Sequence, residues 1–439
     1  MKHTRIRINF VLALFSFLFT GCANPVDLKD FNGNIITVKG KEYVLKGKVM
    51  KDHDLLINGS NVQLNPDKTF EKKLSLEIGD NKYRLEVAPK RRDKDSAFQD
   101  IIIKREMFPA EAEYAKAAAH KVIYKGRSDD IAIDRDYKQL VTVCGHGSPR
   151  IYDLYSGRLV KELPKMKEDL GFVQAVTFTP DNKHILVGMY WSNICCIIDT
   201  NNYSYLKSIR CGGGGGRFAI SYPANAIITS SNGIFRIDPN NFNIMGNYHN
   251  YGSVAAISFD PTGKYIASSI GGYGGLIKIT DTDKFRTSFN DQGYRDYELK
   301  NAIKSKIANY DIKRIIWNSS GDGIIGGSDR GELVVCRFNK DKSFDVIKSV
   351  TVGSSIYSLA LNQDNTILIT STKTHVIVLD YPSLKNKITF ETHGNKVIFS
   401  LDNDIFYYAN NIGVFEATLK NINWQLIDEY YRLKRDKVI

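Results

Sequence analysis

The sequence predicts an all-β protein in two parts, a small antiparallel β-sandwich followed by a ring of four-stranded sheets. Short runs rich in β-branched and aromatic residues alternate with Gly, Pro, Asp and Asn turns along most of the chain. From residue 131 onward this pattern repeats with a period of about 40 residues, which is typical of the blades of a β-propeller. The chain has 439 residues, which is long enough for two or more domains.

The repeat is clearest over residues 253–285, where VAAISF, YIASSI and LIKIT are separated by a DPTGK turn and a GGYGG loop. Turns that end the first strand of successive repeats are 39 to 58 residues apart, and the longest interval is one blade plus an insertion near 293–313. The turns fall near Asp134, Thr179, Ser221, Asp260, Asn318, Asn362 and Leu401. Seven repeats predict seven blades within residues 122–434. Either residues 120–126 or residues 424–431 supply the outermost strand of the last blade.

A second marker is an Asp that follows an apolar run and precedes a short turn. It occurs at Asp153, Asp199, Asp238, Asp281 and Asp380. An Asp at this place can accept backbone N–H bonds two residues on and fix the hairpin. The stretch IYDLYSG at 151–157 resembles WD-repeat propellers, but no repeat has Trp before the Asp or opens with Gly-His. The predicted fold class is therefore all-β, with a seven-bladed WD-like β-propeller preceded by a small immunoglobulin-like β-sandwich.

The N-terminus predicts the compartment. A basic start and an apolar run over residues 10–19 lead to Thr20-Gly21-Cys22, which fits a signal peptide over residues 1–21. The Cys after Thr-Gly resembles the bacterial lipoprotein lipobox, and the alternative is an ordinary signal peptide with a coincidental Cys. The resemblance implies lipidation of Cys22, a tether over 22–30 and a place in a bacterial cell envelope. Because Ala23 is not the Asp that favours inner-membrane retention, it implies the outer membrane.

Residues 31–106 alternate apolar and polar side chains over strand lengths, which predicts the sandwich. The stretches LLING, NPDKTF and LEIGDN resemble the immunoglobulin-like module of glucodextranases, which implies a spacer or adhesive role. Residues 107–121 are rich in strong helix formers, with Pro109 placed to start a helix, so they predict a linker helix.

Composition and motifs argue against several function classes. The net charge is +12, but its Lys and Arg are spread along the chain, which favours a solvated surface over nucleic-acid binding. There is no G-x-S-x-G, H-E-x-x-H or phosphate-binding Gly-Lys-Ser/Thr motif, and no Cys/His spacing for zinc. We expect no cofactor, no metal and no catalytic residue, although sequence spacing cannot reveal a site dispersed over several blades.

Four unusual segments are expected on one face of the ring, where loops between second and third strands and links between blades emerge. They are residues 189–192, 211–217, 271–275 and the insertion, in which Leu299, Ile303 and Ile307 have the spacing of an amphipathic helix. The alternative for each is structural, because aromatic residues pack between blades and Gly runs serve turns. The predicted partner-binding residues on this face are His146, Tyr190, Trp191, Arg217, Tyr273 and Arg330. Arg150 and His375 lie on loops of the same face, and His146 with His375 lacks a carboxylate to complete a metal site.

The sequence thus predicts a non-catalytic, lipid-anchored envelope scaffold that binds a protein partner through one propeller face. The alternatives are a glycan-binding or glycan-active envelope protein, which the glucodextranase-like module and the positive charge would suit, and a propeller hydrolase of small molecules. The predicted contacts are a protein partner and the membrane, with a polysaccharide as the alternative and no nucleic acid.

Overall fold

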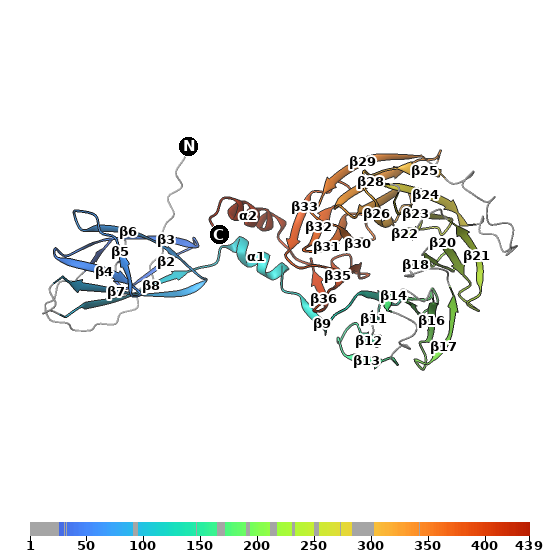
Figure 1. Cartoon of the computed structure of the whole chain (residues 1–439), viewed down its shortest axis with the longest axis horizontal. Coiled ribbons are helices and arrows are strands. Elements are labelled where there is room, and N and C mark those ends of the chain that lie inside the picture. The colour runs from blue at the N-terminus through green and yellow to red at the C-terminus, as the bar shows by residue number, and fades with distance from the viewer. Residues whose placement is uncertain are drawn as a thin grey trace. The chain divides into compact units, whose positions relative to one another are not determined.

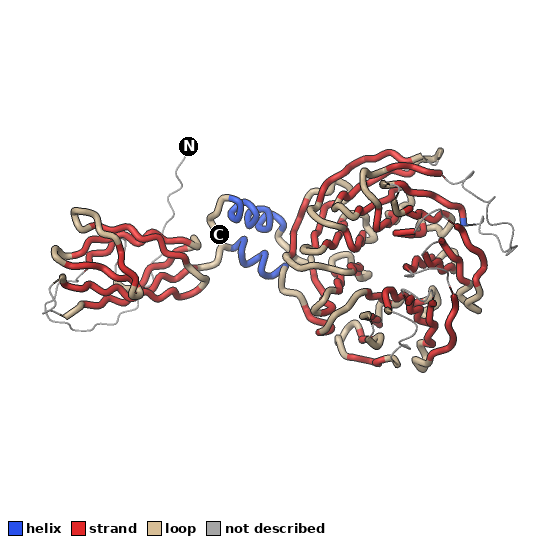
Figure 2. The backbone as a smooth tube through the Cα atoms, in the orientation of Figure 1, coloured by secondary structure: helices blue, strands red, loops and turns tan. Residues whose placement is uncertain are grey.

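The computed structural model describes residues 26–29, 31, 33–90, 95–145, 147–164, 172–189, 194–210, 217–230, 233–249, 254–272, 274–282, 303–341 and 343–439. The chain divides into two compact units, with the boundaries at 112/113 and 428/429. Strands dominate both units, and the described part contains two α-helices, α1 (Pro109–Ala117) and α2 (Trp424–Arg435) (Figure 2). The predicted all-β class, a seven-bladed WD-like ring after a smaller sandwich, is confirmed.

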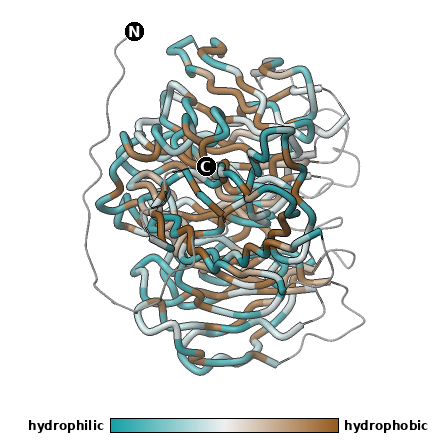
Figure 3. The backbone as a smooth tube through the Cα atoms, turned by 90° about the vertical axis from the view of Figure 1, so that its left-hand side faces the viewer, coloured by the Kyte–Doolittle hydropathy of each residue, from teal (hydrophilic) through white to brown (hydrophobic). Residues whose placement is uncertain are grey.

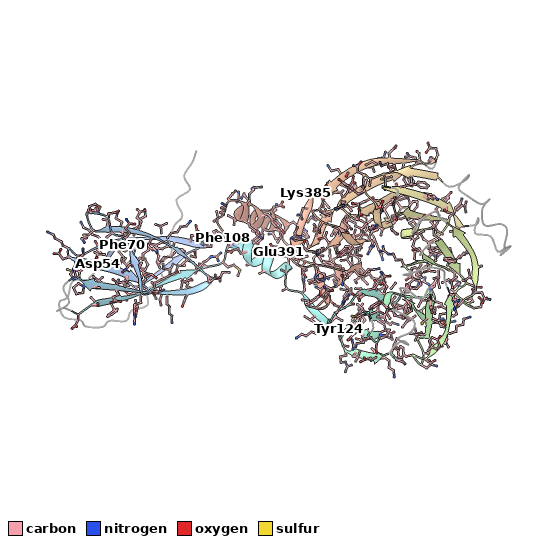
Figure 4. The ribbon with its side chains drawn as sticks, viewed as in Figure 1. Asp54, Phe70, Phe108, Tyr124, Lys385 and Glu391 are labelled. Carbon is pink, nitrogen blue, oxygen red and sulfur yellow. The ribbon has the colours of Figure 1, made fainter. Side chains whose placement is uncertain are left out.

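The N-terminal unit is a two-sheet sandwich. One sheet has the order β1-β3-β6 and the other β2-β8-β7-β4-β5. Alternating side chains of both sheets point inward, so that Leu45, Phe70, Leu85 and Ile101 are almost completely buried between them. Figure 4 labels Phe70 within the sandwich. The strands are β1 (Val26–Leu28), β2 (Ile35–Val38), β3 (Glu42–Val49), β4 (His53–Ile57), β5 (Ser60–Val62), β6 (Thr69–Ser75), β7 (Gly79–Pro89) and β8 (Ala97–Arg105). Its immunoglobulin-like identity stays a prediction.

The second unit is a ring of seven four-stranded antiparallel sheets (Figure 1). Blades one to three comprise β10 (Asp130–Ile133), β11 (Gln139–Val143), β12 (Arg150–Asp153), β13 (Leu159–Glu162), β14 (Val173–Phe178), β15 (His184–Met189), β16 (Ile194–Asp199), β17 (Tyr205–Arg210), β18 (Arg217–Ser221), β19 (Ala226–Ser230), β20 (Gly233–Ile237) and β21 (Ile244–His249). Blades four and five comprise β22 (Val254–Phe259), β23 (Tyr265–Ile270), β24 (Leu276–Asp281), β25 (Ile303–Lys306), β26 (Ile312–Trp317), β27 (Gly323–Ser328), β28 (Glu332–Phe338) and β29 (Phe344–Thr351). Blades six and seven comprise β30 (Ile356–Leu361), β31 (Ile367–Thr372), β32 (Val376–Asp380), β33 (Asn386–Phe390), β34 (Lys396–Phe399), β35 (Ile405–Ala409), β36 (Gly413–Thr418) and β9 (Lys121–Lys125).

The ring is closed by β9, which pairs with β36 and completes the seventh blade. Of the two alternatives for the closing strand, the N-terminal one is correct, and residues 424–431 belong to α2. The closure also ties the last blade to the first, because Arg150 of β12 donates a hydrogen bond to the Tyr124 hydroxyl of β9 at 2.7 Å. Arg150 therefore supports the fold and is not a free polar contact.

A repeated hairpin explains why the blades recur. In five blades the residue directly after the first strand accepts, through its side-chain oxygen, the backbone N–H of the residue five positions further on, at 2.6–3.0 Å. These acceptors are Asp134, Thr179, Asp260, Asn318 and Asn362. In blade three Ser221 accepts from Ala224, and in blade seven the equivalent residue is Ser400, one position before Leu401. A short polar side chain at this place fixes the hairpin between the first two strands.

The Asp residues after the third strands also shape hairpins. Asp199 and Asp238 accept the N–H two residues on, at 2.7 and 2.8 Å, as predicted. Asp153 instead accepts from the backbone and hydroxyl of Ser156, three residues on. Asp380 accepts from the Ser383 hydroxyl at 3.4 Å.

The predicted helix in the insertion is wrong at its C-terminal end. Residues 303–306 form β25, which pairs with β24 as the fourth strand of blade four, while Leu299 lies outside the described residues. Residues i and i+4 share a face in a strand as well as in a helix, so the spacing of Ile303 and Ile307 did not discriminate between them. The insertion, residues 283–302, therefore joins two strands of one blade. It does not link blades four and five.

The cores lie between neighbouring blades. The middle strands β19, β27 and β31 are buried on both faces. In β16 the adjacent Cys195 and Cys196 point into two different inter-blade cores, as expected for opposite faces of a strand. Hydrophobic and hydrophilic stretches alternate along the backbone (Figure 3). Within the described ranges no helix has the length and apolar character needed to cross a membrane.

Candidate functional site

The seven first strands surround a central cavity of about 1250 Å³. Its walls come from β10, β14, β18, β22, β26, β30 and β34, which are the innermost strands of the ring (Figure 1). Each of these strands begins at the face that carries the links between blades and the loops between second and third strands. We call this the loop face.

One level of the cavity is charged. Four residues before the hairpin residue of each blade stand Asp130, Ala175, Arg217, Ala256, Arg314, Ser358 and Lys396, and all of them line the cavity. We call the four charged members, Asp130, Arg217, Arg314 and Lys396, the charged ring. The other three members are small. Two residues further along each strand, away from the loop face, the side chains are uncharged in all seven blades: Ala132, Thr177, Ala219, Ser258, Ile316, Ala360 and Ile398.

The charged ring is held by specific contacts. Lys396 Nζ lies 3.3 Å from Asp130 Oδ1, and Asp130 Oδ2 accepts the N–H of Val176 from the next blade at 3.0 Å. Arg217 and Arg314 each donate a hydrogen bond of 2.7 Å to the same acceptor, the backbone carbonyl of Lys313. Two guanidinium groups from different blades therefore meet at one oxygen.

Positive charge is incompletely balanced in this cavity. Its described lining contains five cationic side chains, of Arg127, Arg217, Arg314, Lys373 and Lys396, and the carboxylates of Asp129 and Asp130. Asp129 pairs with Arg127 at 2.9 Å and Asp130 with Lys396. Among the described residues no carboxylate lies within ion-pair distance of Arg217 or Arg314.

The pKa values of both arginines are lowered, mainly by burial. Burial lowers the pKa of Arg217 to about 10, although the carboxylate of Asp130 opposes the shift. Burial also lowers the pKa of Arg314 well below its usual range, and the charge of Arg217 acts in the same direction. Both side chains are half-buried and line the cavity.

The predicted partner-binding residues are not all in this site. Arg217 is a member of the charged ring. Arg330 lies exposed in the turn between β27 and β28, where its N–H donates to the Ser328 hydroxyl at 3.3 Å, and it does not line the cavity. The other predicted residues, together with the lipidation site, lie outside the described residues: Cys22, His146, Tyr190, Trp191 and Tyr273.

Sequence reasoning missed Asp130, Arg314 and Lys396. The signal was present for Asp130 and Arg314, which stand four residues before the predicted turns at Asp134 and Asn318, whereas Lys396 stands four residues before Ser400 and not before the predicted Leu401. Aligning the repeats on these turns would have placed Asp130 and Arg314 at one level. Of the remaining candidates, His375 contacts the Thr374 hydroxyl through Nδ1 at 2.8 Å. In the described ranges no three His, Cys, Asp or Glu side chains are grouped so as to hold a metal ion.

Comparisons with known proteins agree with this architecture. The family described as "WD domain, G-beta repeat" matches residues 244–281, which run from β21 through β24. No curated protein matches the chain. Among solved structures, a chain of the "Crystal Structure of Mitotic Checkpoint Complex" is similar with a TM-score of 0.55 and 13% identity, over 66% of this chain and 89% of that one. At this identity the likeness shows the fold alone, a WD-like propeller.

Proposed function

We propose that this chain is a non-catalytic scaffold of a bacterial cell envelope, anchored by a lipid at Cys22, whose propeller binds a protein partner through the loop face. The observation that carries the scaffold role is the WD-like propeller itself, which presents loops on a rigid ring. The similar chain from the mitotic checkpoint complex comes from a protein assembly, which supports a role in binding protein. The anchor rests on the sequence Thr20-Gly21-Cys22.

The strand order favours the loop face. Residues 190–193 and 271–275 connect second to third strands, and residues 211–216 connect blades two and three, which are the two kinds of connection that define the loop face. Residues 283–302 connect a third to a fourth strand and belong to the opposite face. Three of the four unusual segments are therefore connections of the kind that defines the loop face, and the charged ring lies in the cavity at the first strands.

Affinity capture after crosslinking in cells tests the scaffold role. We expect the double variant Tyr190→Ala/Trp191→Ala to recover less partner than the wild type, with its melting temperature lowered by no more than about 2 °C. Tyr155→Ala is the matched control, because Tyr155 is 82% exposed in a turn between a third and a fourth strand, on the opposite face. Recovery of no protein, together with retention on peptidoglycan, would replace the scaffold by the glycan-binding alternative.

A separate experiment tests the anchor. Cys22→Ala should abolish labelling by palmitate and release the protein from membranes, whereas Cys144→Ala should do neither. A Cys22→Ala protein that is still labelled and still sediments with membranes would contradict the lipid anchor.

A further inference from the structure

We propose that the charged ring binds the doubly negative head of a small organic molecule, such as an organic phosphate or two carboxylates on one carbon, inside the central cavity. This site is distinct from a protein-binding surface formed by loops. The proposal does not depend on the scaffold role, and either can fail without the other.

The donor geometry suits an oxyanion. A guanidinium is planar and carries five N–H donors, which match the oxygens of carboxylate and phosphate groups. Arg217 and Arg314 each use one guanidinium nitrogen to donate a hydrogen bond to the Lys313 carbonyl. That shared acceptor holds the two groups beside one another and fixes their position. Neither has an unpaired nitrogen shut away from the cavity, so their remaining donors are accessible to a ligand there.

The charge balance sets the charge of the ligand. Three cations of the ring face one carboxylate, and that carboxylate is already engaged by Lys396 and by the N–H of Val176. The ring is therefore left with two positive charges that have no partner among the described residues. Like charges in a partly desolvated site disfavour one another, and the charge of Arg217 adds to burial in lowering the pKa of Arg314. A dianion would relieve this repulsion.

The shape of the cavity indicates an organic anion in preference to a bare inorganic ion. Pockets for small molecules have volumes of about 300–1,000 Å³. The cavity, at about 1250 Å³, is large enough for such a ligand with solvent around it. Beyond the charged ring the walls are uncharged, with Ala132 and Ala219 leaving space and Ile316 and Ile398 giving apolar surface. A molecule with an anionic head and an uncharged body matches both levels.

Calorimetric titration of the purified protein, without any partner, tests the site. The probes are phenylmalonate and phenyl phosphate, titrated in chloride buffer of constant ionic strength at pH 7.5. We expect the wild type to bind at least one of them with a stoichiometry of one. Arg217→Gln and Arg314→Gln should each raise Kd at least ten-fold, because a charge-assisted contact is lost.

Matched variants separate a built site from general positive charge. Arg330→Gln removes the same charge from the same face outside the cavity and should leave Kd within two-fold of the wild type. Arg314→Lys keeps the charge but loses the planar array of N–H donors of the guanidinium. Its Kd should therefore lie between those of the wild type and Arg314→Gln. In chloride buffer Arg217→Gln should melt no lower than the wild type, since it relieves repulsion. Should either Gln variant fail to fold, Lys396→Gln and Arg314→Lys carry the comparison.

Three results would overturn the proposal. They are binding of neither probe by the folded wild type, equal weakening by Arg330→Gln, and unchanged affinity in the folded ring variants. Because no partner protein is present, any of these leaves the scaffold role standing. Loss of partner capture by Tyr190→Ala/Trp191→Ala would in turn say nothing about the anion.

Discussion

The carboxylate of Asp311 holds the backbone of Gly272, whose N–H it accepts through Oδ2 at 2.7 Å. Oδ1 of the same carboxylate accepts the N–H of Gly274 at 2.9 Å. Asp311 lies between blades four and five, so it fixes the glycine-rich loop of blade four from the neighbouring chain segment. Gly272, Gly274 and Gly275 have φ angles of +83°, +51° and +80°, and a Cβ on Gly275 would collide with the backbone of Ala308. These glycines therefore have a structural role.

Asp311→Asn should destabilise the propeller at neutral pH by about 1–2 kcal/mol, because the amide retains one acceptor oxygen for two donors. The hydrogen bond from Gly272 is the largest cause that holds the pKa of Asp311 below its usual value near 3.8. A depressed carboxylate pKa stabilises the fold above the unfolded-state pKa, and this contribution is lost as pH falls through the lower folded-state value. The difference between wild type and variant should therefore be full at pH 6 and shrink below pH 4.

Urea unfolding followed by tryptophan fluorescence measures this difference. All three Trp residues of the chain, at 191, 317 and 424, belong to the propeller unit, so the signal reports on that unit. Asp136→Asn is the control, because Asp136 is exposed in the turn between β10 and β11. A variant difference that is equal at pH 3 and pH 6 would show that the charge of Asp311 is unimportant.

The repeats were predictable from sequence because their determinants are local. The polar residue that ends the first strand lies five residues from the N–H it binds, and the Asp turns span two or three residues. The identity of the closing strand was not predictable, because residues 121–125 and 413–416 meet only when the ring closes. The members of the charged ring are likewise far apart in the sequence, on blades one, three, five and seven. Arg217 follows a run of five glycines, whereas Arg314 and Lys396 stand in ordinary strand sequences of other blades.

The ring closure should depend on Ile123. This side chain of β9 is 6% exposed and packs with Leu154 and Val414, so Ile123→Ala should cost about 2–4 kcal/mol by leaving a cavity. Val122 is its neighbour in the same strand and is 43% exposed, so Val122→Ala should cost less than about 1 kcal/mol. Urea unfolding of both variants measures the contrast. Equal losses would mean that the strand contributes through its backbone pairing alone.

His120 should make propeller stability fall in mild acid. Its Nδ1 lies 2.8 Å from the Tyr408 hydroxyl, its ring packs edge-on against Phe390, and burial lowers its pKa below the usual 6.5. The unfolded chain then binds a proton at a pH where the folded chain does not. Stability is therefore full above about pH 7 and falls by up to about 1.4 kcal/mol per pH unit as pH drops through 6.5.

Unfolding at pH 7.5, 6.5 and 5.5 checks this dependence. His120→Gln should be less stable than the wild type at pH 7.5 but should lose less stability on acidification. His53→Gln, in the sandwich unit, should leave the pH profile of the tryptophan signal unchanged. A His120→Gln profile parallel to the wild type would rule out His120 as the group that titrates.

The four thiols among the described residues should react with iodoacetamide in an order set by their burial. Cys195, Cys196 and Cys336 are almost completely buried, and burial raises the pKa of Cys336 to about 12. Because the thiolate is the nucleophile, these three should stay unlabelled at pH 8 until the protein unfolds. Cys144 is half-buried at the cavity, and burial followed by the charge of Asp129 raises the pKa of its thiol, so it should react slowly in the native state. Peptide mapping by mass spectrometry distinguishes the four sites. Native labelling of Cys336 as fast as that of Cys144 would show that the core of blade five opens readily.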